Sequence, residues 1–148
     1  MKKTITVLLL LCLMVVCLTG CQKKAEPAAN KASLADELAS IEDKSNALKS
    51  SLENDPLAQA DMNQKSGELR EIWEAALTRA LDEAKAKLPA AEWKALTEAQ
   101  SAWTAATQAA IEAAGKDFEG GSMHALVVNL EAANRTEARV HELCDMLK

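Results

Sequence analysis

Apolar residues recur from residue 33 onward three or four positions apart, which is the spacing of a helix that packs on one face. The recurrence is interrupted around Pro56, around Pro89 and over residues 116–121, KDFEGG. Proline and glycine are the residues that most often mark the ends of helices. No stretch alternates convincingly with the period of two typical of a strand. The pattern therefore predicts an all-α fold, a small antiparallel helical bundle of about four helices.

The residues at the interruptions indicate where the first helices begin and end. Ser33 is a good cap for the first helix, with acidic residues in the turn that follows. Asn54 and Asp55 precede Pro56, and this order predicts a cap followed by proline at the first position of the second helix. Pro89 ends the second helix and can start the third.

The end of the third helix and the start of the fourth are also marked. The third helix is expected over residues 90–114, where Gly115 suits a left-handed cap. Residues 116–121 then form the one convincing loop of the domain. Ser122 is expected to cap the fourth helix.

The first helix carries a narrow apolar seam, interrupted at one position by Ser45. Such a seam packs either on the rest of the same domain or on a second copy of the chain, so the oligomeric state stays open. The seam residues are Leu34, Leu38, Ile41, Leu48 and Leu52.

The beginning of the chain has the features of a secretory signal. Lys2 and Lys3 are followed by an apolar run over residues 4–18, which is shorter than the roughly 20 residues of a membrane-spanning helix. Leu18-Thr19-Gly20-Cys21 then resembles the bacterial lipobox, in which the cysteine is acylated with fatty acids such as palmitate and the bond before it is cut. We therefore expect residues 1–20 to be a lipoprotein signal peptide and Cys21 to be the lipidation site.

Cleavage would leave a lipid-anchored domain on a short tether. Residues 21–32 are polar and contain Pro27, as expected of a flexible linker, and the helical domain follows over residues 33–148. The residue after the cysteine is Gln22 rather than aspartate, which by the sorting rule for envelope lipoproteins indicates the outer membrane, facing the periplasm, in a Gram-negative cell. Cys144 would then be the one unmodified thiol, so no internal disulfide is expected.

The charge of the chain argues against nucleic acid as a partner. The formal net charge is −5, and loss of Lys2 and Lys3 would leave 15 basic against 22 acidic side chains, a net charge of −7. Among the few aromatic residues are three tryptophans, which we expect to form one core cluster; a groove for a small apolar ligand is the alternative. These residues are Trp73, Trp93 and Trp103.

The sequence offers no constellation of catalytic or metal-binding residues. His124 and His141 are the only histidines, and His141 with Cys144 three positions later supplies too few ligands for a closed zinc site. No phosphate-binding or dinucleotide-binding glycine motif occurs, and the carboxylates are scattered along helical faces. We therefore expect no enzyme activity, no metal and no cofactor.

Several short motifs between residues 62 and 143 resemble the LprI-type domain, a small helical module of bacterial envelope proteins named after a lipoprotein inhibitor of lysozyme. Four motifs carry the resemblance: Met-Asn, Leu-x-x-Ala-Gln-x-x-Trp, Gly-Gly-Ser-Met and Thr-x-x-Arg-x-x-x-Leu. They stand here as Met62 and Asn63; Leu96, Ala99, Gln100 and Trp103; Gly120, Gly121, Ser122 and Met123; and Thr136, Arg139 and Leu143.

The chain also departs from the family pattern. The usual cysteines, which commonly pair in the family, are replaced by Lys65, Ile111 and a residue at about Glu131. The Arg-Asp pair after the tryptophan is replaced by Thr107 and Gln108. The resemblance thus implies the family fold without its disulfides.

The motif residues can all be given structural roles. Gly120 and Gly121 allow a chain reversal, and Met123 is expected in the core. We expect Gln100 to hydrogen-bond a loop carbonyl or an adjoining side chain, and Arg139 to pair with a carboxylate on a neighbouring helix.

The resemblance implies an envelope protein that binds another protein, with lysozyme inhibition as its most specific form. A structural or assembly lipoprotein without that activity is the alternative, with the apolar seam as its contact surface. If lysozyme is the partner, the narrow turn between the last two helices is the element able to enter an enzyme cleft. Its candidate contact residues are Lys116, Phe118, Ser122 and His124.

The lipobox makes a direct prediction. Cys21→Ser should leave the precursor uncleaved and unlabelled by a fatty-acid analogue, because the thiol that accepts the lipid is gone. Metabolic labelling followed by gel analysis measures both effects. Equal labelling of the wild type and the variant would contradict the lipidation of Cys21.

Overall fold

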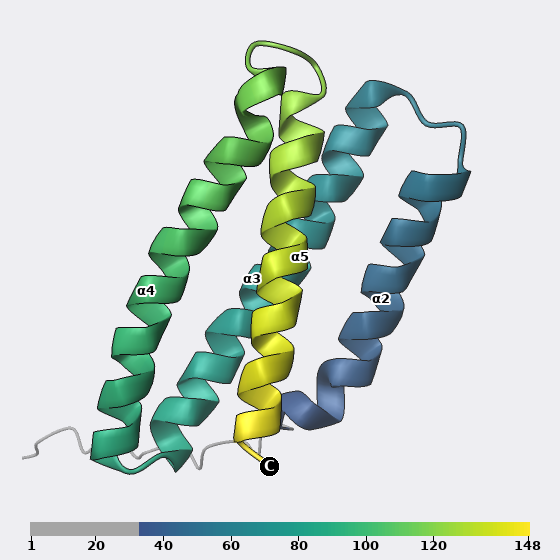
Figure 1. The fold of residues 1–148 in the computed structure, drawn as a ribbon. Helices are drawn as coiled ribbons and strands as arrows, with labels where there is room; N and C mark the ends of the chain where they lie inside the picture. Colours follow the sequence, from purple (N-terminus) through teal and green to yellow (C-terminus); the bar gives the residue numbers. More distant parts are fainter. Residues whose placement is uncertain (1–32) are drawn as a thin grey trace, which may run out of the picture. The chain divides into compact units, whose positions relative to one another are not determined.

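The computed structural model describes residues 33–148, which form four α-helices and one short 3-10 helix (Figure 1). The predicted signal peptide, Cys21 and the tether lie outside the described residues. None of the described helices combines the length and apolar character that a membrane span requires. The prediction of an all-α bundle is confirmed. The elements are α2 (Leu34–Asn54), α3 (Gln59–Lys87), α4 (Ala90–Gly115), η1 (Lys116–Phe118) and α5 (His124–Met146).

Helices that follow one another in the chain run in opposite directions (Figure 1). The backbone N–H of Leu34, at the start of α2, donates to Glu83 near the end of α3. Asn129 near the start of α5 reaches Ser66 near the start of α3, so these two helices run in the same direction. α3 and α5 form the most extensive interface, with α2 packed on α3 and α4 packed on α5.

The interface at the centre of the bundle is built largely from small side chains. Alanines are completely or almost completely buried on both α3 and α5, and small side chains let two helix backbones approach closely. Larger residues, including Leu69, Val140 and Leu143, fill the remaining space. The buried alanines are Ala76, Ala80 and Ala84 on α3, and Ala132 and Ala133 on α5.

The largest side chain of the core brings three helices together. Trp73 of α3 is completely buried, and its indole N–H donates a hydrogen bond of 3.0 Å to the hydroxyl of Ser45 on α2. The ring of His141 on α5 lies 5.7 Å from the Trp73 ring, measured between centroids. Ser45, which interrupts the apolar seam, is therefore the polar partner that a buried tryptophan requires.

The seam of α2 packs within its own chain. Leu34 is buried, and Leu38, Ile41 and Leu48 pack against the core formed with α3 and α5. An ion pair of 2.5 Å between Lys49 and Glu137 also joins α2 to α5. Four of the five seam residues are therefore engaged within the chain, whereas Leu52 at the end of the seam lines a groove between α2 and α5.

The first helix begins as the sequence predicts. The hydroxyl of Ser33 accepts from the backbone N–H of Asp36, and the Asp36 carboxylate accepts from the backbone N–H of Ser33. Pro89 is likewise confirmed as a boundary, since α3 ends at Lys87 and α4 begins directly after the proline.

The predicted start of the second helix at Pro56 is wrong. Asp55 instead ends α2, with its backbone N–H donating to the carbonyl of Ser51, and α3 begins three residues after Pro56 at Gln59. A proline disfavours helical torsion angles in the residue before it. Asp55 accordingly has an extended conformation, and the chain needs further residues to turn before it can start a new helix.

The expectation of a single tryptophan cluster is also wrong. Trp93 packs against the core around Trp73, but Trp103 lies outside this core. Its ring is half-buried beside Arg139, whose guanidinium carbon lies 6.0 Å from the ring centroid. Trp103 follows Trp93 by ten residues, and the difference in angle around α4 directs it toward α5.

The buried hydrogen bond between Trp73 and Ser45 leads to a stability prediction. Ser45→Ala should lower the free energy of unfolding by about 1–3 kcal/mol, because the indole N–H loses its acceptor. In a Trp73→Phe background the same substitution should cost less, since no indole N–H remains. Urea denaturation of the four variants of this cycle measures the coupling. Ser40→Ala, at an exposed position of the same helix, is the control, and an equal loss there would contradict the assignment.

Candidate functional site at the α4–α5 connection

The connection between α4 and α5 begins where the two helices approach most tightly. A Cβ atom on Gly115 would lie 2.6 Å from Val128 Cγ1 and 2.9 Å from His124 Nε2. Gly115 has right-handed helical torsion angles and leads directly into η1, so the predicted left-handed cap is wrong. Glycine is needed here because α5 leaves no room for a side chain.

The chain reverses at the two glycines that follow. Gly120 has a φ of +72°, a left-handed conformation that favours glycine, and no atom would contact a Cβ there. The backbone N–H of Gly121 donates to the carbonyl of Phe118 over 2.9 Å, which closes the turn. The predicted role of Gly120 and Gly121 in the chain reversal is confirmed.

The predicted roles of Ser122 and Met123 are both wrong. α5 begins at His124 without a side-chain cap, and Met123 is 44 % exposed rather than in the core. Met123 already has right-handed helical torsion angles, and its carbonyl accepts from the backbone N–H of Val127. The backbone N–H of His124 donates to the carbonyl of Gly121 over 3.2 Å, so a backbone carbonyl of the turn, not the Ser122 hydroxyl, accepts from the start of α5.

The Met-Asn motif, residues 62 and 63 of α3, holds the turn in place. The side-chain amide of Asn63 donates to the carbonyl of Ser122 over 2.9 Å. The side-chain amide of Gln59, one turn earlier on α3, donates to the side-chain Oδ1 of Asn63 over 2.9 Å. Two motifs that lie 59 residues apart in the sequence are thus joined at one end of the bundle. Met62, beside Asn63, is half-buried.

The four candidate contact residues are not equally accessible. Lys116 and Ser122 are exposed, and Phe118 is half-buried at the end of η1. His124 is half-buried, and its ring faces the backbone of Gly115. The surface of the turn therefore offers an ammonium, a hydroxyl, the exposed thioether of Met123 and the carboxylates of Asp117 and Glu119, while His124 helps to pack the two helices.

A second group of motif residues lies along the α4–α5 interface. Arg139 donates from Nε to the amide oxygen of Gln100 over 2.9 Å and from Nη1 to Glu142 over 2.8 Å. Gln100 bonds an adjoining side chain, as predicted. Arg139 has its carboxylate partner on its own helix, which corrects the expected pairing across helices. The side chain of Arg139 is only 14 % exposed, and its Nη2 atom is buried without a hydrogen-bond partner.

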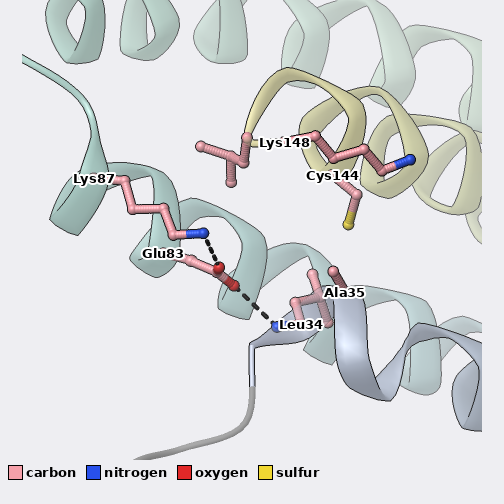
Figure 2. A pocket seen from close by; sticks show the side chains of 7 residues that line it. Leu34, Ala35, Glu83, Lys87, Cys144 and Lys148 are labelled. Atoms are coloured by element: carbon pink, nitrogen blue, oxygen red, sulfur yellow. Dashed lines mark hydrogen bonds and ion pairs between the residues drawn. The ribbon is translucent and has the colours of Figure 1, made fainter.

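The opposite end of the bundle holds the Cys144 thiol beside a cavity of about 210 Å³. Figure 2 shows the thiol pointing toward the start of α2. Burial is the main cause that raises the pKa of Cys144, and the negative charge of Glu83 adds to it. Because the thiolate is the reactive form, this cysteine is a poor nucleophile.

Glu83 ties the start of α2 to α3 at this cavity. Its carboxylate accepts from Lys87 Nζ over 2.6 Å and from the Leu34 backbone N–H over 3.0 Å (Figure 2). The bond from Lys87, and after it the bond from Leu34, lowers the pKa of Glu83. This stabilisation is present above the usual pKa of glutamate and is lost as the pH falls through the lowered value.

Across residues 33–148, no group of three or more histidine, cysteine or acidic residues is arranged to hold a metal ion. His141 contacts residues of two other helices, α2 and α3. Its Nε2 atom lies 3.7 Å from a Glu42 oxygen, and its ring lies beside Trp73.

Comparison with known proteins identifies the family. The family model described as lysozyme inhibitor LprI matches residues 51–143, which is more than half of the chain. The chain belongs to the LprI family. The match includes the whole region 62–143 that the sequence motifs indicate, and it starts 11 residues earlier, in the last turn of α2. The description of the family names an inhibitor of an enzyme rather than an enzyme. No curated protein and no solved structure gives a significant match.

Within the LprI family region, sequence reasoning missed two features. Ser66 is completely buried on α3, where its hydroxyl donates to the Asn63 carbonyl and accepts from Asn129. A groove between α2 and α5 was also missed, although the half-buried leucines Leu52, Leu126 and Leu130 are visible in the sequence as helical apolar positions.

The tight contact at Gly115 predicts opposite effects for two glycine substitutions. Gly115→Ala should lower the free energy of unfolding by about 1–3 kcal/mol, because its Cβ would overlap Val128. Gly67→Ala should raise it by up to about 1 kcal/mol, because its Cβ finds ordinary contacts and alanine favours the helix. Thermal denaturation of both variants tests this. A stabilised Gly115→Ala variant would show that α4 and α5 are packed less closely.

Proposed function

We propose that the chain is a lipid-anchored bacterial envelope protein that binds and inhibits lysozyme through the α4–α5 connection. The observation that carries this proposal is the hydrogen bond from Asn63 to the Ser122 carbonyl. It joins the Met-Asn motif of α3 to the exposed turn that carries the Gly-Gly-Ser-Met motif, in a chain whose family is described as lysozyme inhibitors.

The position of the turn supports its use as a contact surface. An anchor on Cys21 connects to the domain through Ser33 at the start of α2. The α4–α5 connection lies at the other end of the bundle (Figure 1). Because α4 has 26 residues, it separates the two ends by about 39 Å at 1.5 Å per residue. The point at which a lipidated segment would join the domain is therefore far from the turn.

The shape of the turn suits the cleft of a glycosidase. The catalytic carboxyl groups of such enzymes flank a space that holds a sugar. A helix is about 10–12 Å wide with its side chains, whereas a glycine turn is narrower. Lys116 and Ser122 are the exposed hydrogen-bond donors in this turn, and donors are the groups that catalytic carboxylates accept from.

The charge of the domain supports a cationic partner. The net charge of −5 would become −7 after signal cleavage, and opposite charges speed the encounter of two proteins. The same electrostatic attraction makes the association sensitive to salt, because ions at physiological concentration screen exposed charges beyond about 8 Å.

This proposal predicts that the full chain, purified in mild detergent, slows the lysis of peptidoglycan by a cationic lysozyme. Lys116→Ala combined with Ser122→Ala should weaken inhibition by about tenfold or more, because both donors are lost from the contact. Inhibition by the wild type should also weaken as salt is raised. Turbidity loss of a cell-wall suspension, followed against inhibitor concentration, measures each effect.

The matched control is Lys85→Ala combined with Ser40→Ala, which removes the same groups from exposed positions away from the turn. Its inhibition should stay within about twofold of the wild type. If the wild type fails to inhibit several cationic lysozymes at high micromolar concentration, the proposed function is wrong. Equal losses in both double variants would contradict the role of the turn.

A further inference from the structure

A groove separates α2 from α5 at the same end of the bundle as the α4–α5 connection. It encloses about 330 Å³, and its apolar lining is formed by Leu52, Met62, Leu126 and Leu130. All four side chains are half-buried, so the groove presents apolar surface that the chain itself does not cover. Pockets for small ligands range from about 300 to 1,000 Å³, and this one lies at the lower limit, suited to one or two side chains.

The groove lies close to the turn. Met62, which lines the groove, precedes Asn63, whose side chain donates to the carbonyl of Ser122. Leu126 lies on the first turn of α5, three residues after the exposed Met123. A protein bound to the turn would therefore also lie close to the groove.

The surroundings of the groove favour a cationic occupant. Lys49 lines it, but its ammonium is paired with Glu137 at 2.5 Å. Lys65 and Lys116 offset only part of the negative charge at this end of the bundle. The exposed acidic residues of this end include Glu53, Asp55, Asp61, Glu112, Asp117 and Glu119.

We infer that the groove receives an apolar side chain flanked by basic residues on the surface of the lysozyme that the turn contacts. This inference rests on the proposed function and enlarges its interface from the turn to the surface between α2 and α5. The apolar lining would bury the side chain, and the acidic residues around it would pair with its basic neighbours. Glu53 lines the groove and is exposed, so it is the carboxylate placed to make such a pair.

The methionines provide a direct test, because three of them report on three separate surfaces. Met62 lies in the groove, Met123 lies in the turn and Met146 is 47 % exposed near the other end of α5. The full chain is labelled with ¹³C-methyl methionine, purified in detergent and titrated with a cationic c-type lysozyme. The Met62 and Met123 methyl resonances should change with the same apparent Kd, while that of Met146 keeps its position.

Other results of this titration would overturn the inference in distinguishable ways. If the lysozyme is inhibited and Met123 changes but Met62 does not, the turn alone binds and the groove is not involved. If no methyl resonance changes and no inhibition is seen, the proposed function and the inference are both wrong. If Met62 responds to dilution of the chain without lysozyme, a second copy occupies the groove instead.

A pair of charge reversals provides an independent test. Glu53→Lys should raise the Kd for lysozyme about tenfold or more, because it places a cation where the basic neighbours would lie. Glu71→Lys makes the same change at an exposed position of α3, on the face away from Met62, and should alter the Kd by no more than about twofold. Circular dichroism checks that both variants keep the wild-type helicity. Equal effects of the two substitutions would indicate only long-range attraction and would overturn the assignment of the groove.

Discussion

The fold depends on one hydrogen bond, because the buried indole N–H of Trp73 needs an acceptor. Trp73 is the largest completely buried side chain, and its ring would make a favourable core residue for its area alone. An N–H in the same place without a partner would be costly. The hydroxyl of Ser45 removes this cost and fixes the position of α2 along α3, while His141 brings α5 against the same ring. One polar contact thus selects a single arrangement of helices from the many that a seam of leucines and alanines would permit.

The features that could be predicted from the sequence are those decided by a few neighbouring residues. Ser33 with Asp36, Pro89, and the glycine pair at 120 and 121 each act through their own backbone or one adjacent turn. The failures share a different origin. Gly115 is required by a helix that follows later in the chain, and Trp103 is drawn toward Arg139, which lies 36 positions away. Periodicity shows which residues face inward but not what they meet there.

The candidate site illustrates the same division. The family resemblance supplied Asn63 and the Gly-Gly-Ser-Met segment as separate motifs, and the structure joins them through a backbone carbonyl. No residue type identifies such an acceptor, because every residue has one. The sequence points to the Ser122 hydroxyl, whereas the backbone carbonyl of this residue makes the contact that holds the turn. The groove could not be predicted from the sequence, because it depends on the distance between α2 and α5, which no sequence pattern encodes.

The burial of Cys144 has a consequence for the reactions open to its thiol. Its thiol is buried among α2, α3 and α5 once the helices have packed, and this burial raises the pKa of the thiol. In an oxidising compartment an accessible thiol would form mixed disulfides with other secreted chains. The packed helices thus protect the thiol, and any local opening that separates α2 from α3 and α5 would expose it to such exchange.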